Sequence, residues 1–519
     1  MEKVDVVIVG AGAAGCLLAA KLSQAGKKVI ILEAGPERKM LDLYSSQIWA
    51  RRLKWGGPPT EVAGKDPISD HFGQGWGTGG AALHHYAVWL RLHAEDFEMK
   101  SRFGEGLDWP IFYDDLRPFY DEIQKEVGIS GDAEKEVWRP PGEPYPMPPL
   151  SLFNQARIIE LGFKKLGLRT SPLPLAINSV EYNGRPACIY DGWCDAGCPI
   201  YALANPLAVY LPQAQKAGAV VLNDSYVTRL LTDDKGDRVA GVEYYGLKGE
   251  RQFQEADLVI LAAFALQNPR ILLNSNNDKN PNGLANSSGL VGRHFMGHSA
   301  ANVFGLFKED TQNFMGVTGG QLLSQENYAK ELRKGFVGSS QWLIGNALKP
   351  NDLLGIVNSR PDIFGPSLHK FLRTASRHLG TMTFVGENLP ALESRMVLSD
   401  KKDRHGLPLA RVIHDLGADD VKCFEAGMKQ GRKIFKAAGA YDVWAGGRAS
   451  MHLMGGTIMG SAPKNSVTNS FGQSHDLANL FIAGSGLFPT SGAVNPTFTI
   501  HALALRAARY ITENWSSVT

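Results

Sequence analysis

The first 33 residues combine a strand, a glycine-rich turn, a helix and a second strand in immediate succession. Residues 4–9 are rich in β-branched side chains, as expected for a strand buried on both faces. The turn GAGAAG follows and leads into an alanine- and leucine-rich segment that ends near Gly26. Residues 29–32 then predict a second strand, followed directly by Glu33.

This order predicts a dinucleotide-binding βαβ unit. A lone G-x-G-x-x-G motif is weak evidence, but here it lies between strand and helix, and Glu33 follows about 20 positions after its first glycine. The helix N-terminus can receive a pyrophosphate, and Glu33 can accept hydrogen bonds from ribose hydroxyls. The residues assigned to this site are Gly10, Gly12, Ala13, Ala14, Gly15 and Glu33.

Two later segments favour a flavin dinucleotide over a nicotinamide one. Residues 73–80 hold five glycines, beginning at Gly73, just before a helix-like run. Residues 479–511 predict a strand, a glycine loop and a long alanine-rich helix starting near Asn495. The N-terminal dipole of that helix could stabilise negative charge on a reduced flavin ring. An NAD dehydrogenase has no need of this second glycine–helix element, so we expect the C-terminal segment to fold back onto the N-terminal sheet.

At this point the sequence resembles the glucose–methanol–choline (GMC) oxidoreductase family along its whole length, and most closely the bacterial FAD sugar and polyol dehydrogenase large subunits. The resemblance rests on GAGAAG…LEAG, GTGGAALHH, ADLVILAAFALQNPRILLNS, NGLANSSGLVGRHFMGH, MHLMGGTIMGS and the C-terminal segment. The sequence departs from the family pattern at Phe264, where glycine is usual, and at Asn268, where Ser or Thr is usual.

The resemblance implies a fold that combines α/β and α+β architecture. A Rossmann-like FAD-binding domain is expected from the discontinuous segments 1–100, 205–305 and 450–519. An antiparallel-sheet substrate domain is expected from 101–204 and 306–449, with a cysteine-rich loop at 188–198. The additional FAD-binding residues that it implies are Gly79, Gly80, His84, Val227, Gly484, Asn495, Pro496 and Thr497.

The resemblance also implies oxidation of an alcohol, with His452 and Asn495 as the catalytic pair. The flavin accepts the hydride, so the protein must supply a base for the hydroxyl proton, and histidine has a suitable pKa. We expect neutral His452 to take this proton and Asn495 to hydrogen-bond the same oxygen. The alternative for His452 is a loop histidine without a chemical role. His84 occupies the position at which some family members attach FAD covalently, and the alternative is a histidine that merely packs on the flavin. His501 is expected to be structural, and His85 a pocket or core residue.

Cys188, Cys194 and Cys198 lie close together in the sequence and are followed by Pro199. Three local cysteines do not complete the usual four ligands of an iron–sulfur cluster, but they would suit a [3Fe–4S] cluster. The related sugar dehydrogenases carry such a cluster and pass electrons to a cytochrome c subunit. The alternatives are a packed cysteine-lined loop or a single disulfide.

Charge and hydropathy exclude several other classes. The formal net charge is only +2, from 54 basic and 52 acidic residues, so no strong field favours nucleic acid. Uninterrupted apolar runs are too short for a transmembrane helix, and the acidic N-terminal residues argue against a signal peptide. We therefore expect a cytoplasmic protein, or a periplasmic one if it is exported with a signal-bearing small subunit.

The leading hypothesis is an FAD dehydrogenase that acts on a sugar, sugar acid, polyol or glycoside. It would oxidise a secondary alcohol to a ketone, or an anomeric hydroxyl to a lactone. A second hypothesis is an oxidase that passes electrons to O₂ without a cluster. The third is a lyase in which FAD is structural, and the fourth is a non-catalytic flavin-binding scaffold.

Overall fold

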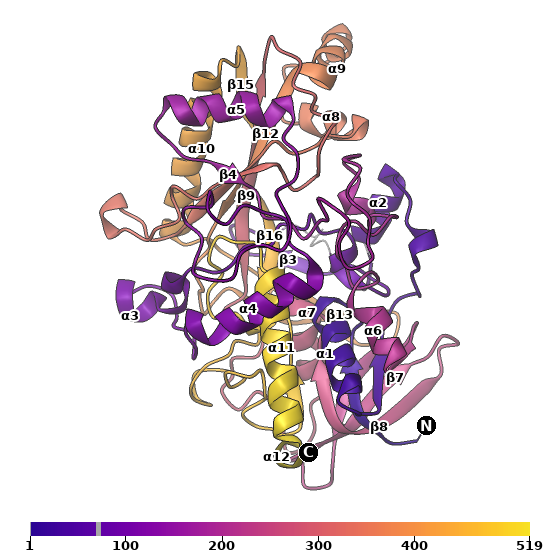
Figure 1. The fold of residues 1–519 in the computed structure, drawn as a ribbon. Helices are drawn as coiled ribbons and strands as arrows, with labels where there is room; N and C mark the ends of the chain where they lie inside the picture. The colour runs from indigo at the N-terminus through magenta and orange to yellow at the C-terminus, as the bar shows by residue number, and fades with distance from the viewer. Residues whose placement is uncertain (1, 55, 69–73) are drawn as a thin grey trace.

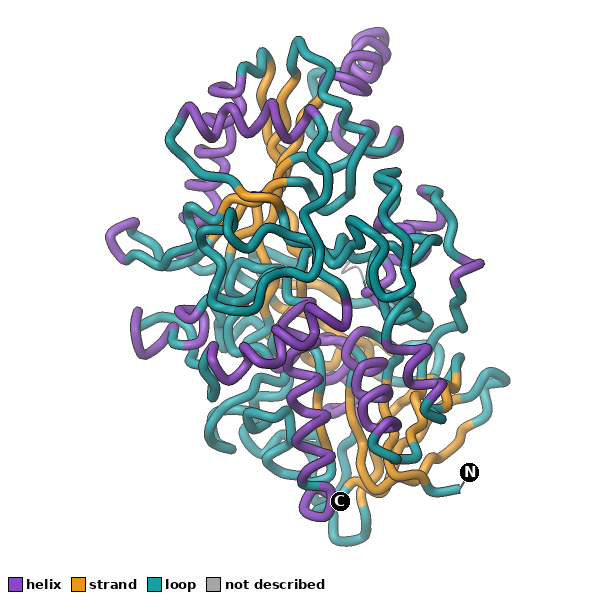
Figure 2. Tube along the Cα trace, viewed as in Figure 1, coloured by secondary structure: helices purple, strands orange, loops and turns teal. Residues whose placement is uncertain are grey.

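The described residues form three β-sheets, and segments far apart in the sequence meet in each of them (Figure 1). The computed structural model describes residues 2–54, 56–68 and 74–519. Gly73, the first glycine of the predicted loop, lies outside these ranges. Long loops connect many of the elements, as the tube view shows (Figure 2). The mixture of α/β and α+β architecture is the fold class that the sequence predicts.

The first sheet is built around β1 (Val4–Val9), which is almost entirely buried. It pairs in parallel with β2 (Val29–Leu32) on one side and with the second half of β8 (Arg251–Leu261) on the other. β5 (Val220–Leu222) continues the parallel sheet beyond β2, and β17 (Leu480–Ile482) pairs in parallel with β8. The C-terminal segment therefore does return to the N-terminal sheet.

An antiparallel extension widens this sheet. The first half of β8 pairs with β7 (Val239–Tyr245), and β7 pairs with β6 (Tyr226–Thr232). The carboxyl ends of the parallel strands remain free to carry loops, and ligands bind beyond this edge in open α/β sheets.

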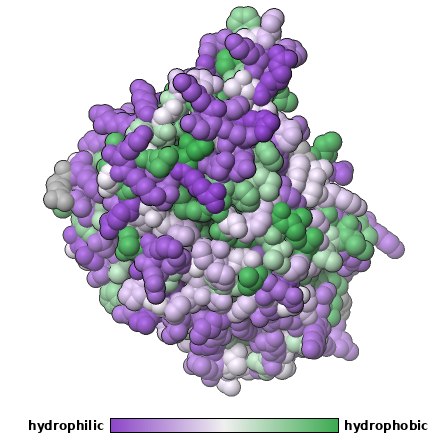
Figure 3. Space-filling view, turned by 45° about the horizontal axis from the view of Figure 1, so that its top comes forward, coloured by the Kyte–Doolittle hydropathy of each residue, from purple (hydrophilic) through white to green (hydrophobic). Residues whose placement is uncertain are grey.

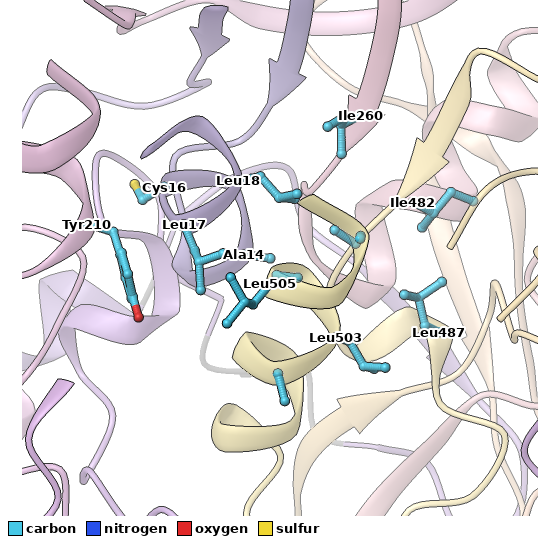
Figure 4. Close-up of a cluster of buried hydrophobic side chains, with 14 of the residues drawn as sticks. Ala14, Cys16, Leu17, Leu18, Tyr210, Ile260, Ile482, Leu487, Leu503 and Leu505 are labelled. Atoms are coloured by element: carbon cyan, nitrogen blue, oxygen red, sulfur yellow. The ribbon is translucent and has the colours of Figure 1, made fainter. Parts of the chain in front are cut away.

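Three helices pack together beside the first sheet. Helix α1 (Ala13–Gln24) packs against α11 (Thr497–Glu513) and against α6 (Tyr210–Lys216). Leu17 of α1 and Leu505 of α11 belong to one buried cluster (Figure 4). A fully buried leucine contributes about 1.5–3 kcal/mol, so this cluster holds the two ends of the sequence together. Figure 1 shows the N- and C-termini at the same end of the molecule.

The second sheet is antiparallel around the long strand β9 (Met296–Leu306). β12 (Leu379–Gly386) pairs with β9 on one side, while β15 (Asp442–Ala445) and β16 (Ala449–Met454) share the other side. The sheet continues from β12 through the strands β11 (Ser340–Ile344), β10 (Leu322–Ser324) and β4 (Ser171–Pro172). Strand β9 crosses the predicted boundary at residues 305 and 306, and the domain limits themselves remain a prediction.

A separate hydrophobic core supports the second sheet. Helices α5 (Asn154–Lys165) and α10 (Ala418–Ala438) pack together and contact it. Trp342, Phe384 and Phe435 are fully buried there. The third sheet consists of β13 (Arg395–Lys402), β14 (Pro408–Ile413) and β3 (Glu61–Ala63).

The remaining helices lie around these sheets. They are α2 (Gln47–Lys54), α3 (Met99–Phe103), α4 (Tyr113–Val127), α7 (Phe264–Asn274), α8 (Pro350–Val357), α9 (Pro366–His378) and α12 (Trp515–Val518). Within the described ranges, no helix combines the length and apolar character that a bilayer span requires. The face in Figure 3 is largely hydrophilic, with hydrophobic side chains in small groups.

Candidate active site

Two glycine loops pack against each other at the carboxyl edge of the first sheet. The backbone N–H of Gly79 donates to the carbonyl oxygen of Ala11, 2.8 Å away. A Cβ on Gly80 would come within 3.2 Å of the Cα of Gly12, so glycine permits this close approach. The loops around Gly10 and Gly79, assigned from separate parts of the sequence, thus form one surface.

Glu33 connects this surface to the end of β2. Its Oε2 accepts a hydrogen bond from the N–H of Ala11 at 2.9 Å, and its Oε1 accepts from Gly35 and Gly77 at 2.9 and 3.1 Å. Burial raises the pKa of Glu33, and the backbone donors partly oppose this shift. Glu33 therefore organises both glycine loops, a role that its sequence position did not reveal.

At the start of α7, the local geometry shows why glycine is usual at position 264 and what Asn268 contributes. Phe264 has a φ of 81°, a left-handed conformation in which glycine is favoured. The Oδ1 of Asn268 accepts from the N–H of Ala263 at 2.8 Å, and its Nδ2 donates to the carbonyl of Ala483 at 3.2 Å. Asn268 thus ties α7 to the residue that follows β17.

A single long cavity of about 480 Å³ joins these loops to the second sheet, and its volume is within the range of small-molecule and cofactor sites. The predicted site residues in its wall are Gly10, Gly12, Ala13, Ala14, Glu33, Gly80, His84, Val227, His452, Gly484, Asn495, Pro496 and Thr497. Gly15 and Gly79 lie just behind the wall. A Cβ on Gly15 would meet the carbonyl oxygen of Gly10 at 2.0 Å.

His452 and Asn495 meet in the wall of this cavity although one lies in a strand of the second sheet and the other in a loop after the first sheet. His452 belongs to β16 of the second sheet, where its φ is 56°. Asn495 lies in the loop between β17 and α11. The Nδ2 of Asn495 is 3.2 Å from the Nε2 of His452, so the pair predicted from the sequence is assembled.

The structure adds a residue that sequence reasoning missed. His298 of β9 is fully buried, and its Nδ1 lies 2.9 Å from the Nδ1 of His452. Burial lowers the pKa of His452 well below its usual value, and the neighbouring His298 lowers it further. Burial also lowers the pKa of His298 to about 4. Both imidazoles are therefore neutral at pH 7. The second histidine of GRHFMGH carried no signal of this contact.

More than half of the chain matches known family descriptions. Residues 149–300 and 390–504 match the N- and C-terminal GMC oxidoreductase descriptions, and residues 5–58 match an FAD binding domain. A fructose dehydrogenase large subunit from Gluconobacter japonicus is 31% identical, with 97% of each chain covered. The chain belongs to the GMC oxidoreductase family.

Two further relatives of this GMC oxidoreductase also align over nearly full length. A 2-methyl-1,2-propanediol dehydrogenase from Mycolicibacterium austroafricanum is 30% identical, with 100% of this chain and 96% of the relative covered. A gluconate 2-dehydrogenase flavoprotein from Pantoea cypripedii is 28% identical, with 99% and 94% covered. The protein is thus an oxidoreductase of the flavoprotein type.

Solved structures confirm the fold. Pyridoxine 4-oxidase from Mesorbium loti matches with a TM-score of 0.69 and 18% identity, over 98% of this chain and 99% of that one. A formate oxidase variant from Aspergillus oryzae RIB40 matches with a TM-score of 0.70 and 14% identity, over 100% and 99%.

The cavity of this GMC oxidoreductase fits FAD. A Cβ on Gly12 would meet no atom within 4 Å, so the missing side chain leaves open space directly beside the N-terminus of α1. The N-terminal residue of α11, Thr497, lines the same cavity. Two helix N-termini therefore face one elongated site, as anionic parts of a dinucleotide require. The individual contacts to FAD remain predictions.

The other histidines near the cavity have distinct surroundings. His84 lies in the cavity wall at the end of the glycine loop. His85 also lines the wall, and burial lowers its pKa to about 3. His501 is buried in α11, where its Nδ1 lies 2.7 Å from the carbonyl oxygen of Thr497. This internal contact agrees with the structural role expected for His501.

The cysteine-rich loop lies outside the cavity wall, and all three of its cysteines are free thiols. Burial raises the pKa of Cys188 to about 11 and that of Cys194 to about 12. Each of the three sulfurs accepts a hydrogen bond from a backbone N–H. The donors are Tyr190 for Cys188 at 3.3 Å, Thr318 for Cys194 at 3.4 Å and Leu203 for Cys198 at 3.4 Å. Among the described residues, no three His, Cys, Asp or Glu side chains are arranged to hold a metal ion. The thiols as placed do not fit a cluster.

Proposed function

We propose that this GMC oxidoreductase oxidises a hydroxyl group of a neutral sugar, polyol or glycoside to a carbonyl group. The product is a ketone from a secondary alcohol, or a lactone from an anomeric hydroxyl. The contact between His452 Nε2 and Asn495 Nδ2 in the cavity wall carries this proposal. Two of its relatives, named as fructose and 2-methyl-1,2-propanediol dehydrogenases, support the neutral substrate class.

The cavity wall favours an uncharged substrate over a sugar acid. The second sheet and its neighbouring loops contribute Gly319, Leu343, Asn346, Thr383 and Ser450, none of which is charged. Within the described part of the wall, the acidic and basic side chains are Glu33 and Arg270. Glu33 belongs to the glycine loops, and Arg270 is paired with Asp403 at 2.8 Å. A carboxylate brought to the histidine would therefore lose its hydration without gaining a cation.

The protein residues have complementary tasks in this reaction. Bound FAD supplies the hydride acceptor. Neutral His452 accepts the hydroxyl proton at Nε2, a typical general-base role for histidine. Asn495 donates an Nδ2 hydrogen to the same hydroxyl oxygen and so fixes its position beside the base. Asn346 and Thr383 offer amide and hydroxyl groups for the other hydroxyls of the substrate.

An anaerobic screen of sugars, polyols, glycosides and sugar acids tests the proposal. Flavin colour should be lost with one or more neutral members and retained with the acids. A dehydrogenase should form no peroxide in air, whereas stoichiometric peroxide would favour the oxidase alternative. Retention of the yellow colour with every alcohol would contradict the proposal and favour a lyase or a scaffold.

Substitution of the base provides a second test. His452→Ala should slow flavin reduction by about 10²–10⁴, the usual loss when a general base is removed. His369→Ala is the matched control because His369 is exposed on α9. An unchanged reduction rate in His452→Ala would refute the role of His452.

We also propose His84 as the point of covalent FAD attachment, supported by the family resemblance and by its place in the cavity wall. Acid precipitation of the holoprotein should then leave the flavin in the pellet, and His84→Ala should release it to the supernatant. Release of flavin from the wild-type protein would contradict the link.

We also propose a [3Fe–4S] cluster at Cys188, Cys194 and Cys198, which the family resemblance of the cysteine loop alone supports. The loop would have to close further around the metal. The holoprotein should then contain about three iron atoms per chain, because each of the three cysteines holds one iron. Iron-free protein with full flavin reduction would remove this proposal.

We propose a small subunit and a cytochrome c as electron-accepting partners, because one relative is named as a large subunit. Co-purification of both with the tagged protein would support this, and a monomer that reduces no cytochrome would contradict it.

The proposed location is the cytoplasm, or the periplasm if a signal-bearing partner exports the complex. Cell fractionation distinguishes the two.

A further inference from the structure

A continuous series of hydrogen bonds runs through His452 and ends on a backbone carbonyl. On one side of His452, its Nδ1 lies 2.9 Å from the Nδ1 of His298. The Nε2 of His298 lies in turn 2.8 Å from the carbonyl oxygen of Gly492. On the other side, the Nε2 of His452 lies 3.2 Å from the Nδ2 of Asn495.

The carbonyl of Gly492 fixes the position of every hydrogen in this series. A carbonyl oxygen can only accept, so the Nε2 of His298 must carry the hydrogen. A neutral imidazole has one N–H and one acceptor nitrogen, so the Nδ1 of His298 accepts. The Nδ1 of His452 must therefore carry a hydrogen and donate it to His298. The Nε2 of His452 is left with its lone pair.

Three amides on the opposite side are oriented with the same polarity. The Oε1 of Gln325 lies 3.3 Å from the Nε2 of His93, and its Nε2 donates to the Oε1 of Gln341 at 3.0 Å. The Nε2 of Gln341 donates to the Oδ1 of Asn495 at 3.3 Å. With its oxygen engaged by Gln341, Asn495 must turn its NH₂ group towards His452, which matches the lone pair derived above.

We propose that His298 and Gln341 are positioning residues that hold His452 in the tautomer with its Nε2 lone pair in the cavity wall. The inference rests on the proposed function, in which Nε2 takes the hydroxyl proton. When that proton arrives, His452 has a hydrogen on both ring nitrogens, and its Nδ1–H remains bonded to the neutral acceptor nitrogen of His298. The buried positive charge thus has a partner at the moment it forms, which a buried charge requires.

Substitutions at His298 separate this role from simple packing. His298→Leu removes the acceptor and should slow anaerobic flavin reduction by about 10²-fold, within the range for impaired general-base catalysis. The substrate Kd for this step should change little. His298→Gln offers an oxygen to His452 and an NH₂ group to Gly492, so its rate should return to within about tenfold of wild type. The control is His414→Leu, because His414 is also buried and also bonds a backbone carbonyl. This variant measures the cost of losing a buried imidazole.

Substitutions at Gln341 test the amide side. A carboxylate in Gln341→Glu can only accept, so Asn495 must present its NH₂ group to Glu and its oxygen to His452. This sets an oxygen against the Nε2 lone pair of the tautomer that Gly492 imposes, and the repulsion should slow reduction by about 10²-fold. Gln341→Ala removes the hydrogen bond to Asn495 without reversing its direction, so the rate of flavin reduction should fall by less than about tenfold. Gln430→Glu is the control for the added negative charge. The Oε1 of Gln430 accepts hydrogen bonds from Asn327 and Trp342, and a carboxylate oxygen can accept the same two bonds.

Solid-state ¹⁵N NMR of histidine-labelled protein gives a readout that needs no substrate. The His452 signals, identified by their loss in His452→Ala, should show a hydrogen on Nδ1 and an acceptor-type Nε2, and Gln341→Glu should shift the Nε2 signal because it removes the hydrogen-bond donor that faces it. A hydrogen on Nε2 in the wild type would overturn the proposal, as would equal rates in the Leu and Gln variants of His298. If His452→Ala itself reduces flavin at the wild-type rate, the base assignment fails first, and the positioning role fails with it.

Discussion

A side chain on Gly15 would place its Cβ 2.0 Å from the carbonyl oxygen of Gly10. The start of α1 is therefore pressed against the turn that precedes it. Gly12 lies between them, yet a Cβ there would meet no atom within 4 Å. The two glycines of one motif thus serve different purposes, since one allows packing and the other leaves room in the cavity.

These two positions should respond differently to the same substitution. Gly15→Ala should lower both the melting temperature and the FAD content, because the helix must shift away from the turn. Gly12→Ala should leave the melting temperature of the apoprotein unchanged and lower only the FAD content. Calorimetry of apoprotein and flavin absorbance of purified protein provide the measurements. Equal melting temperatures for the two variants would contradict this distinction.

The buried environment of His452 predicts an unusual pH profile. Burial and the neighbouring His298 hold the pKa of His452 well below 6.5, so the base remains neutral as the pH falls from about 8 to about 6.5. Flavin reduction under anaerobic stopped-flow conditions should be flat across this range and decline only in more acidic buffer. A decline centred at about pH 7 would show that His452 titrates like an exposed histidine.

A buried charge cluster lies behind the loop that carries Asn495. The Nζ of Lys330 is 2.6 Å from Glu387 and 2.9 Å from Asp96, and all three side chains are fully buried. Burial opposes the charge on Lys330, but the two carboxylates raise its pKa above the usual value. Tyr328 donates to Asp96 at 2.8 Å and accepts from the N–H of Ala493 at 3.1 Å. The cluster therefore supports the backbone next to Gly492.

Lys330→Met should destabilise the protein by about 3–5 kcal/mol, the cost of leaving buried charges without their partner. Denaturant unfolding measures the change. The triple variant Lys330→Met, Asp96→Asn, Glu387→Gln removes all the charges and should recover most of the lost stability. If the single and triple variants unfold at the same denaturant concentration, the lysine is not compensating the two acids.

Asn268 should tolerate a small polar replacement but not an apolar one. Asn268→Leu leaves the N–H of Ala263 and the carbonyl of Ala483 without their partner, at about 1–3 kcal/mol for each buried group. Asn268→Ser keeps a hydroxyl for at least one of these contacts and should cost less. Thermal unfolding compares the two. A Leu variant as stable as the Ser variant would show that these hydrogen bonds contribute nothing.

The sequence predicted local units well where one segment supplies the whole pattern. Strand β1, strand β2 and the glycine turn occur where the alternation of residue types placed them. The return of the C-terminal segment to the first sheet also followed, because a second glycine–helix element needed a shared ligand.

Contacts between isolated residues could not be predicted in the same way. His298 and Gln341 are single residues in unremarkable strands, and only the pairing of the second sheet brings them to His452 and Asn495. The backbone contacts of Glu33 could not be predicted, because the dinucleotide-binding motif relates this side chain to a ligand and carries no information about the neighbouring loop.

The position of β17 and α11 has a consequence for biosynthesis. The ribosome makes these elements after residues 262–479, which separate them from β8. Until they emerge, the parallel sheet lacks β17, and α1 has no α11 to pack against. The pocket is therefore incomplete until β17 and α11 have been synthesised, so stable flavin binding must follow their synthesis.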